Sequence, residues 1–419
     1  MALTGNGRLR VDVSAGGLGM PASGALIRVT PRGESMNIIE EIVADSSGQS
    51  PVLNLPAPSP DFSMLPAASG ERPYTEYDVL VTKEGYEDCE VRGVQVLPNA
   101  TASQPVTLTP LSVQGGAQDI INIAEHTLWG QYPPKIPEEA VKELPAPSGF
   151  VVLSEALIPE YMIVHTGTPS NASSAHYTVP FRDYIKNVAS SEIFANWPEE
   201  TLKANVLAIT SFALNRVYTE WYKSQGYSFT ITNSTAYDQA FNYGRNIFVE
   251  ISRVVDDLFT NFITKPNISQ PLMTQYCDGR KVSCPGWMTQ WGSKDLGDQG
   301  YSAMDILKRY YGYDIYLMQA KSVAGIPSSY PGTPLQMWSS GENVRTLQRQ
   351  LNTISNNYPL IKKVPVDGQF GDSTRQAVET FQDIFSLPSD GVVGQSTWYK
   401  ISYIYVAVTK MAETKVSVG

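Results

Sequence analysis

A single glutamate, Glu192, is the residue whose position most suggests acid–base chemistry. It follows two serines in "SSEIFANWPEETLKA" and precedes a short connection to the next helical pattern. Glu199 and Glu200 have a structural explanation, because carboxylates in a first turn stabilise the positive end of the helix dipole. Glu192 has no such role. An apolar setting could raise its pKa far enough for the carboxyl group to donate a proton.

Zinc-dependent hydrolysis is an alternative from another class of reaction, and it would use histidines with a carboxylate or a cysteine. The three histidines are His126, His165 and His176. His126 lies outside the segment that contains Glu192, and the other two would need a third ligand from a distant part of the chain. We therefore expect neither a metal nor another cofactor.

The three cysteines are too few for a disulfide framework, and the odd count leaves at least one of them unpaired within the chain. Cys277 and Cys284 lie close together in "CDGRKVSC". This spacing is open to a disulfide, a metal pair or two free thiols. A local disulfide is the interpretation that we prefer.

The composition is typical of a globular chain with several domains. Its 419 residues, of which 42% are apolar, exceed what one hydrophobic core usually organises. The formal net charge of −10 argues against a nucleic acid or an anionic membrane as the main partner. No stretch is long and apolar enough to cross a bilayer, and no signal-peptide pattern is evident at the start. We expect production without classical export.

The chain is predicted to be a multidomain α+β protein. Alternating apolar residues, with Gly, Pro and Ser between the runs, predict a small N-terminal β-sandwich over residues 1–113. A helical piece, "AQDIINIAEHTLWGQ", and a proline-rich interdomain tether are expected in residues 114–151. A central mixed α/β catalytic domain is predicted over 152–325, and three short helices over 335–410.

Two consecutive helices are expected to position Glu192. Phe181, Tyr184, Ile185 and Val188 share one helical face, and this helix carries Glu192 to its end. The next helix starts in "ANWPEE", where the asparagine is expected to cap it and the proline suits its first turn. The glutamate therefore lies at the junction between two helices.

The C-terminal part contains an internal repeat. "DGQFGDST" begins at Asp367 and "DGVVGQST" begins at Asp390. In each copy Asp-Gly is expected to form a tight turn, and Ser or Thr to cap a helix. Together with "GENVRTLQRQLN", these stretches resemble the peptidoglycan-binding domain found at the ends of cell-wall hydrolases. The resemblance covers residues 335–405 and implies a three-helix module that binds peptidoglycan.

The segment around Glu192 resembles the stage II sporulation D family, whose members are lytic transglycosylases acting on peptidoglycan. "SSEIFANWPEETLKANVLAITSFALNR" carries the resemblance, and "STAYDQAF", "MTQYCDGR" and "YSAMDILKRYYG" follow in the family's order. The resemblance implies that Glu192 is the catalytic glutamate. Gln239 and Tyr276 keep their family identity, which makes them candidates for auxiliary or substrate-binding residues.

This chain departs from the family pattern in two places. An arginine of the family falls on Thr210. The histidine and cysteine of the family's metal-linked loop fall on Tyr237 and Asp238, which argues against a metal in that loop.

A lytic transglycosylase needs one essential carboxyl group, whereas ordinary glycosidases need two. Its nucleophile is the 6-hydroxyl of the muramic acid, which is already tethered beside the anomeric carbon. The resemblance thus implies cleavage between N-acetylmuramic acid and N-acetylglucosamine with a 1,6-anhydro product. Ile193, Phe194 and Trp197 could supply an apolar setting for the glutamate. Asp238 could instead supply the second carboxylate of a glycan hydrolase.

Two tryptophans are candidates for contact with sugar. "CPGWMTQWG" has the Gly and Pro of a loop, and an exposed indole at Trp287 or Trp291 could stack on the C–H face of a sugar ring. The structural alternative is that both belong to the core, where aromatic side chains usually lie.

The whole chain resembles the precursors of clostridial spore cortex-lytic enzymes, most sharply at "VVLSEALIPEYMIVHTG". This resemblance implies a zymogen in the cortex or coat region of the spore, activated at germination by cleavage at Val151 and Val152. The implied partners are cortex peptidoglycan with muramic-δ-lactam and a subtilisin-like germination protease. The alternatives are an N-acetylmuramoyl-L-alanine amidase, a glycan hydrolase or a non-catalytic scaffold of the spore wall.

Overall fold

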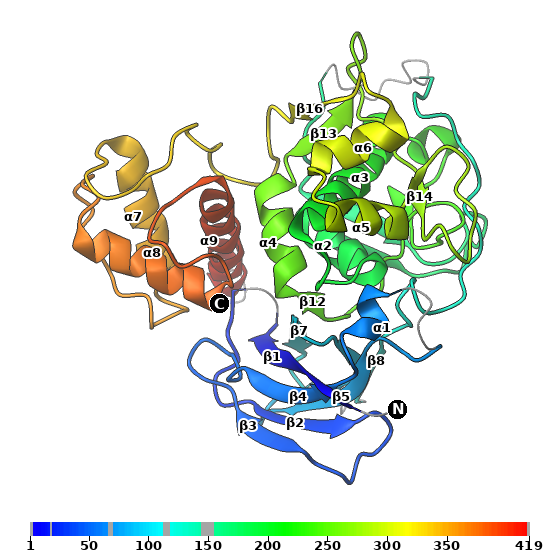
Figure 1. The fold of residues 1–419 in the computed structure, drawn as a ribbon. Coiled ribbons are helices and arrows are strands. Elements are labelled where there is room, and N and C mark those ends of the chain that lie inside the picture. The colour runs from blue at the N-terminus through cyan, green and yellow to red at the C-terminus, as the bar shows by residue number, and fades with distance from the viewer. Residues whose placement is uncertain (1–2, 17–18, 66–69, 112–117, 144–154, 417–419) are drawn as a thin grey trace.

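The computed structural model describes residues 3–16, 19–65, 70–111, 118–143 and 155–416. The prediction of mixed α and β structure is confirmed. Figure 1 shows two sheets at one end of the molecule, a group of helices and short strands above them, and three further helices to one side.

Two sheets form the N-terminal part. One has the order β12-β7-β1-β4, and the other has the order β3-β2-β5-β6-β8. Their bounds, with the one-turn helix α1, are β1 Gly5–Ala15, β2 Leu26–Pro31, β3 Glu40–Val43, β4 Leu53–Ala57, α1 Asp61–Met64, β5 Thr75–Thr82, β6 Cys89–Val96, β7 Thr101–Leu108, β8 Asp119–Asn122 and β12 Ile247–Phe248.

Alternation of apolar and polar residues explains these sheets. In β1, Leu9, Val11 and Val13 are buried, and the residues between them are more exposed, as a strand with one covered face requires. Val79 of β5 and Val91 of β6 are likewise fully buried, in the same core as the residues of β1. The two sheets therefore share one core.

The prediction of a helix after β7 is wrong, because Asp119–Asn122 form strand β8 instead. β8 pairs in parallel with β6, from Cys89 beside Asp119 to Arg92 beside Asn122. The open edge of β6 offers backbone hydrogen-bonding groups that an isolated helix would leave unused. Tertiary pairing has overridden local helix propensity.

The central part surrounds one long buried helix, α3. Its elements are β9 Tyr161–His165, β10 His176–Pro180, α2 Phe181–Glu192, α3 Glu199–Tyr218, η1 Lys223–Gln225, β11 Ile231–Thr232, α4 Val249–Leu258, β13 Asn261–Thr264, β14 Tyr276–Cys277, β15 Met288–Thr289, α5 Gln290–Asp298, α6 Ala303–Tyr311 and β16 Tyr316–Gln319. The short strands form the sheets β10-β9-β11, β13-β16 and β14-β15. α3 is buried on nearly every side, which its apolar residues and small alanines permit.

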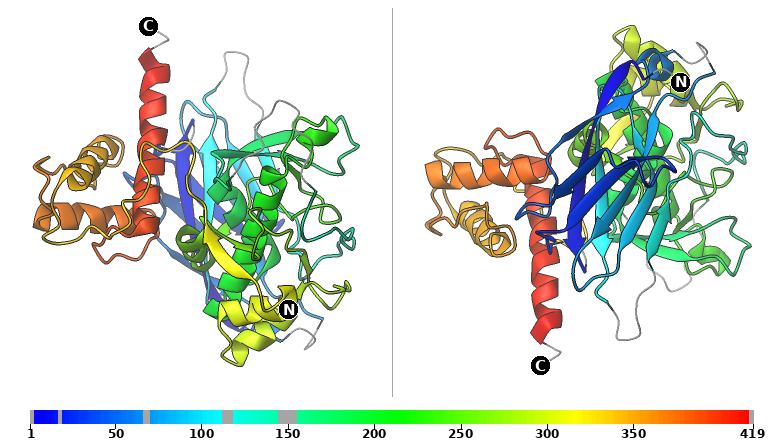
Figure 2. Two further views of the ribbon diagram at one scale, coloured as in Figure 1. Left: turned by 90° about the horizontal axis from the view of Figure 1, so that it is seen from above. Right: turned by 90° about the horizontal axis from the view of Figure 1, so that it is seen from below.

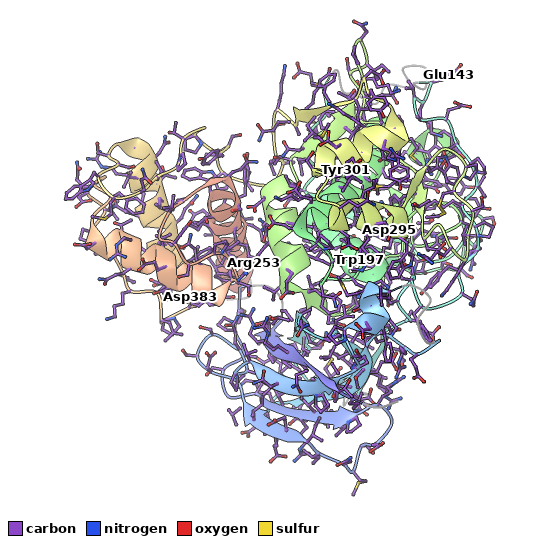
Figure 3. The ribbon with its side chains drawn as sticks, in the orientation of Figure 1. Glu143, Trp197, Arg253, Asp295, Tyr301 and Asp383 are labelled. Atoms are coloured by element: carbon purple, nitrogen blue, oxygen red, sulfur yellow. A yellow bond between two sulfur atoms is a disulfide. The ribbon has the colours of Figure 1, made fainter. Side chains whose placement is uncertain are left out.

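The start of α3 differs in one detail from the expectation. Asn196 does not cap the helix, since its side-chain nitrogen donates to the hydroxyl of Ser63 in α1 at 2.6 Å. Trp197 makes a second contact with the same residue, because its ring nitrogen donates to the carbonyl of Ser63 at 2.9 Å. Figure 3 shows Trp197 directly above α1. The turn before α3 therefore joins the central part to the N-terminal part.

The C-terminal helices are α7 Glu342–Ile354, α8 Asp372–Ile384 and α9 Gln395–Val416. The repeated Asp-Gly turns have the same internal partner, a glutamine from the preceding helix. Gln348 binds Asp367 at 2.9 Å and accepts from the N–H of the following glycine. Gln382 does the same with Asp390 at 2.8 Å. Figure 2 shows α9 extending well past the other two helices.

Within the described residues, no helix combines the length and the apolar character that spanning a membrane would require.

Candidate active site

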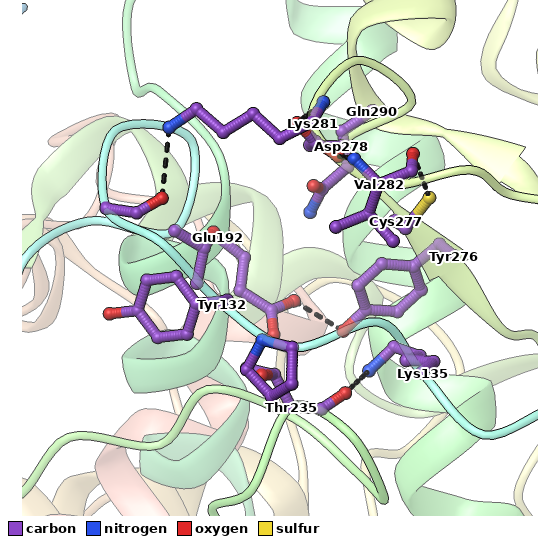
Figure 4. A pocket seen from close by; sticks show the side chains of 13 residues that line it. Tyr132, Lys135, Glu192, Thr235, Tyr276, Cys277, Asp278, Lys281, Val282 and Gln290 are labelled. Atoms are coloured by element: carbon purple, nitrogen blue, oxygen red, sulfur yellow. Dashed lines mark hydrogen bonds between the residues drawn. The ribbon is translucent and has the colours of Figure 1, made fainter.

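Glu192 is the last residue of α2, and its carboxylate lies in a pocket (Figure 4). The backbone N–H of Ala240 donates to Oε1 at 2.8 Å, and the hydroxyl of Tyr276 donates to Oε2 at 2.5 Å. Only 3% of Glu192 is exposed. The helix ends here because Ile193 adopts an extended conformation, which turns the chain toward α3.

Burial raises the pKa of the Glu192 carboxyl group above its ordinary value. Lys135 and the hydrogen bonds from Tyr276 and Ala240 act in the opposite direction, because they stabilise the ionised form, but burial prevails. A carboxyl group with a raised pKa keeps its proton closer to neutral pH. Glu192 therefore has the property that a general acid needs.

A chain of hydrogen bonds fixes the hydroxyl group that contacts Glu192. The side-chain nitrogen of Gln239 donates to the hydroxyl of Tyr276 at 3.0 Å, and its oxygen accepts from Tyr184 at 3.0 Å. All three side chains are buried. The structure thus brings Gln239 and Tyr276 to Glu192, and it adds Tyr184 from the helix that carries the glutamate.

Asp238 does not contribute a second carboxylate to the pocket. It is fully buried, and it accepts hydrogen bonds from Arg216 at 2.7 Å, Tyr222 at 2.6 Å and the hydroxyl of Thr232 at 2.7 Å. These contacts account for both oxygens of the carboxylate. Asp238 anchors the loop before Gln239, and its candidacy as a second acid or base is wrong.

Trp291 is also different from the expectation. It is 5% exposed, and its ring packs 5.0 Å from that of Trp197 and 6.2 Å from that of Phe194, measured between centroids. Trp291 is the second residue of α5 and its side chain is buried in the core, so it presents no face to a sugar. Trp287 is half-buried, and its role in glycan contact stays a prediction.

Cys277 and Cys284 form a disulfide, which confirms the preferred interpretation. Cys277 and Asp278 line the pocket of Glu192, so the disulfide closes a loop at its edge.

His165 and His176 contact each other on β9 and β10 at 2.9 Å, and His126 is buried against Phe194. Among the described residues, no group of three or more His, Cys, Asp or Glu side chains is placed to hold a metal.

Residues 123–143 form a strap that crosses the pocket on its way out of the N-terminal part. The strap supplies five of the pocket's lining residues, namely Thr127, Gly130, Tyr132, Pro133 and Lys135. Backbone hydrogen bonds hold it along its length, from Thr127 to Ser191 at 3.0 Å and from Ile136 to Ala236 at 2.7 Å. The carbonyl of Ala140 accepts from the N–H of Met273 at 2.8 Å. The expected tether is extended here, and these hydrogen bonds hold it against the central part.

Lys135 places an ammonium group inside the pocket (Figure 4). Its Nζ donates to the backbone carbonyls of Asp238 and Thr235. The same group lies over the ring of Tyr276, 5.1 Å from the centroid. Burial lowers the pKa of Lys135, and the charge of Glu192 opposes that effect. A strap cation thus lies next to the candidate acid.

An ion-pair clamp fastens the strap to α3. Arg216 donates to Glu138 of the strap at 2.6 and 2.8 Å, and its Nε donates to Asp238 at 2.7 Å. Lys142 also binds Glu138 at 2.5 Å. Arg216 is 1% exposed. The clamp therefore connects the strap to the loop that holds Gln239.

The predicted cleavage residues Val151 and Val152 lie outside the described residues.

The sequence analysis did not identify Lys135, Tyr132 and Arg216 as functional residues. No local signal marks them, because a lysine between two prolines and an isoleucine looks like part of a linker. Only the path of the strap brings Lys135 and Tyr132 to the pocket of Glu192, and Arg216 of α3 binds the strap through Glu138.

Two family models match this chain. The stage II sporulation protein (SpoIID) family matches residues 170–257, which include Glu192, and a peptidoglycan binding domain matches residues 340–401. Both family resemblances are confirmed. The matches support a cell-wall-related function in sporulation.

Three similar proteins each match a small part of the chain. A zinc D-Ala-D-Ala carboxypeptidase of Streptomyces albus G is 40% identical over 74 residues, which are 17% of this chain and only 27% of that enzyme. An uncharacterized protein of Kitasatospora aureofaciens is 34% identical over 99 residues, 22% of this chain and 80% of that protein. The SleB N-terminal domain is 32% identical over 18% of this chain and 99% of its own, with a TM-score of 0.16.

The chain therefore combines a segment that matches the stage II sporulation protein family with a C-terminal segment that matches a peptidoglycan binding domain.

Proposed function

We propose that the protein is a peptidoglycan lytic transglycosylase with Glu192 as its catalytic residue. The observation that carries the proposal is the carboxyl group of Glu192, buried in a pocket and held by Tyr276 and Ala240, with a raised pKa. It lies within the match to the stage II sporulation protein family. Peptidoglycan as the substrate is supported by the match over residues 340–401.

In the proposed reaction, Glu192 transfers its proton to the glycosidic oxygen as the bond from the muramic acid C1 breaks. The 6-hydroxyl of the same muramic acid attacks C1, and its proton returns to the Glu192 carboxylate. The products are a 1,6-anhydro muramic acid end and a free hydroxyl on N-acetylglucosamine. No water is consumed, and one carboxyl group completes the cycle.

Glu192→Gln tests the catalytic assignment. The amide is nearly isosteric but supplies no acidic proton, so we expect cleavage of peptidoglycan to fall by at least about a thousandfold. Mass spectrometry of the muropeptides from the native enzyme should show products one water lighter than hydrolysis products. Turnover near that of the native enzyme in the variant would place the catalytic group elsewhere.

A glycan hydrolase is the second candidate, favoured by one observation. Asp278 lines the same pocket as Glu192 and could serve as a second carboxylate. Its two oxygens, however, accept the backbone N–H groups of Lys281 and Val282 at 2.8 and 2.9 Å, as in a turn. Products that carry an added water, together with loss of activity in Asp278→Asn, would favour the hydrolase.

We further propose that the chain is a zymogen of four parts, 1–113, 114–151, 152–325 and 335–410, whose activation requires cleavage at Val151 and Val152. The strap supports this proposal, because its residues occupy the wall of the pocket through which glycan must reach Glu192. A subtilisin-like germination protease is the proposed activating partner, and cortex peptidoglycan with muramic-δ-lactam is the proposed substrate. The spore cortex or coat region is the proposed location.

The zymogen proposal is tested by comparing cortex lysis by the intact chain with lysis by the same chain after limited proteolysis. We expect lysis only after cleavage. Full activity of the intact chain would contradict the proposal. Absence of any digestion by either form would favour a non-catalytic wall scaffold instead.

A further inference from the structure

A second cavity, of about 430 Å³, adjoins the pocket of Glu192. Tyr132 of the strap lines both of them. Ser191 and Ala240 line the second cavity, and Ala240 is the residue whose N–H holds the carboxylate of Glu192. The candidate acid therefore lies between the two hollows, with Tyr132 between them on the strap side.

Two stacked tyrosines form part of the wall of this second cavity. The rings of Tyr177 in β10 and Tyr243 are 4.3 Å apart between centroids and within 14° of parallel. Tyr243 is 49% exposed, although it already covers Tyr177. An aromatic face that stays open beside a cavity is available for stacking on an apolar ligand face.

Polar side chains on the same wall add hydrogen-bonding capacity. Asn242 lines the cavity next to the tyrosine pair. Asn233 lines it as well, although its side chain already accepts from the N–H of Gly167 and donates to the carbonyl of Phe241. Amide groups donate and accept hydrogen bonds, which suits hydroxyl and acetamido groups. Aromatic faces with nearby amides fit the two faces of an N-acetylated sugar, apolar C–H on one side and polar substituents at the rim.

A third cavity, of about 440 Å³, continues in the direction of the C-terminal helices. It shares Phe241 and Tyr243 with the second cavity. Its other walls include Asp12 and Gln49 of the N-terminal part, Tyr358, which follows α7, and Lys400 of α9. Figure 1 shows α9 beside α4 at this junction. Tyr243 thus lies on the wall of two connected hollows.

We propose that these hollows form one glycan-binding groove, which runs from Glu192 past the stacked pair Tyr177–Tyr243 to the C-terminal helices. Tyr243 is the central substrate-binding residue of this groove, and its ligand is a strand of N-acetylated sugars. The inference rests on the proposed function. It explains how a strand held by the C-terminal part reaches the catalytic pocket without leaving the protein surface.

The test measures sugar binding to the chain with Glu192→Gln, both intact and after limited proteolysis, so that no cleavage of the sugar interferes. The probe is the tetramer of N-acetylglucosamine, titrated in a calorimeter. Adding Tyr243→Ala should weaken binding by about tenfold, because the stacking face is lost. Tyr243→Phe keeps the face and should bind like the parent. Tyr313→Ala, which removes a tyrosine that is 81% exposed elsewhere, is the matched control and should also bind like the parent.

Three outcomes would overturn the groove: no binding by the parent chain in either the intact or the proteolysed form, unchanged affinity in Tyr243→Ala, or a loss of affinity in Tyr243→Phe equal to that in Tyr243→Ala. Thermal unfolding of each variant separates lost binding from lost folding. The proposed function fails separately, if the native chain binds the tetramer but cleaves no peptidoglycan in intact or proteolysed form.

Discussion

The carboxylate of Glu192 accepts hydrogen bonds from two donors, Ala240 and Tyr276, and is almost fully buried. A buried carboxylate with such partners would often have a low pKa, since each donor stabilises the charged form. Here burial outweighs both donors and the neighbouring Lys135, so the pKa is raised. The balance raises the pKa of the carboxyl group, and the two hydrogen bonds fix its orientation.

Tyr276→Phe tests that balance. Removing the hydroxyl removes a donor that stabilises the carboxylate, so the pKa of Glu192 should rise. We expect the activity that depends on protonated Glu192 to extend to higher pH, while kcat falls roughly tenfold because the carboxyl group is less well oriented. The measurement is the pH profile of kcat on soluble glycan fragments. Tyr311→Phe is the control, because its hydroxyl donates to the backbone oxygen of Gln275 and Tyr311 is not among the residues that line the pocket of Glu192.

Glu192→Gln should also change stability, in a way that depends on pH. Folding raises the pKa of Glu192, so the folded chain retains a proton that the unfolded chain loses as pH rises above about 4.5. The contribution of Glu192 to the free energy of unfolding of the native protein therefore decreases as pH rises toward the pKa of the folded state. Since glutamine does not titrate, the Tm of the variant relative to the native protein should increase as pH rises above about 4.5. A constant difference in Tm would contradict the raised pKa.

At the scale of elements, α2, α3 and the strap build the site together. α2 ends at Glu192, and α3 supplies Arg216 on its face toward the strap. Arg216 holds Glu138 and Asp238 at once, so the strap and the loop before Gln239 depend on one buried cation. Breaking a buried pair is expensive, because the remaining charge loses its partner.

Glu138→Gln should loosen the strap. The amide cannot form the two charged hydrogen bonds to Arg216, and we expect the backbone amides of residues 127–143 to exchange with deuterium roughly tenfold faster. Mass spectrometry of peptides from this segment measures the change. Glu139→Gln, at the exposed neighbouring position, is the matched control. Equal exchange in both variants would mean that the backbone hydrogen bonds alone hold the strap.

At the scale of the whole molecule, the three groups of elements are joined by specific contacts. β12, which lies within the central part, adds a strand to the N-terminal sheet beside β7. On the other side, Tyr403 of α9 donates to Asp183 of α2 at 2.8 Å. The rings of Phe259 and Tyr399 pack 5.5 Å apart at the same junction. These contacts hold the proposed binding module close to the proposed catalytic part.

Lys400 of α9 links this junction to pH. Burial lowers the pKa of Lys400 to about 7, and the nearby Lys186 and Arg182 act in the same direction, whereas Asp256 and Asp183 oppose it. Between about pH 7 and pH 10.5 the unfolded chain binds a proton that the folded chain lacks, so stability from this group should increase with pH. Lys400→Met should abolish that increase, as measured by Tm across this range. Lys362→Met, at an exposed lysine, should leave it unchanged.

The sequence by itself determined the local features around Glu192. The 3.6-residue spacing from Phe181 to Val188 predicted α2 correctly, because the apolar stripe must face a core. The motifs also identified both matched domains, and they selected Tyr276, which binds Glu192, and Gln239, which binds Tyr276. The repeated Asp-Gly turns at Asp367 and Asp390 followed from turn chemistry alone.

The tertiary structure decided what lies against those features. Asp238 and Trp291 carry groups that suit catalysis and sugar binding, but long-range packing buries both. Asp238 is bound by Arg216, and Trp291 packs against Trp197. Lys135 gained its place because the strap crosses the pocket, and β8 formed because β6 had a free edge to pair with. Local sequence fixes periodicity and turns within a few residues. Which side chains become buried or meet across a pocket depends on contacts between segments far apart in the chain, and no local pattern encodes those contacts.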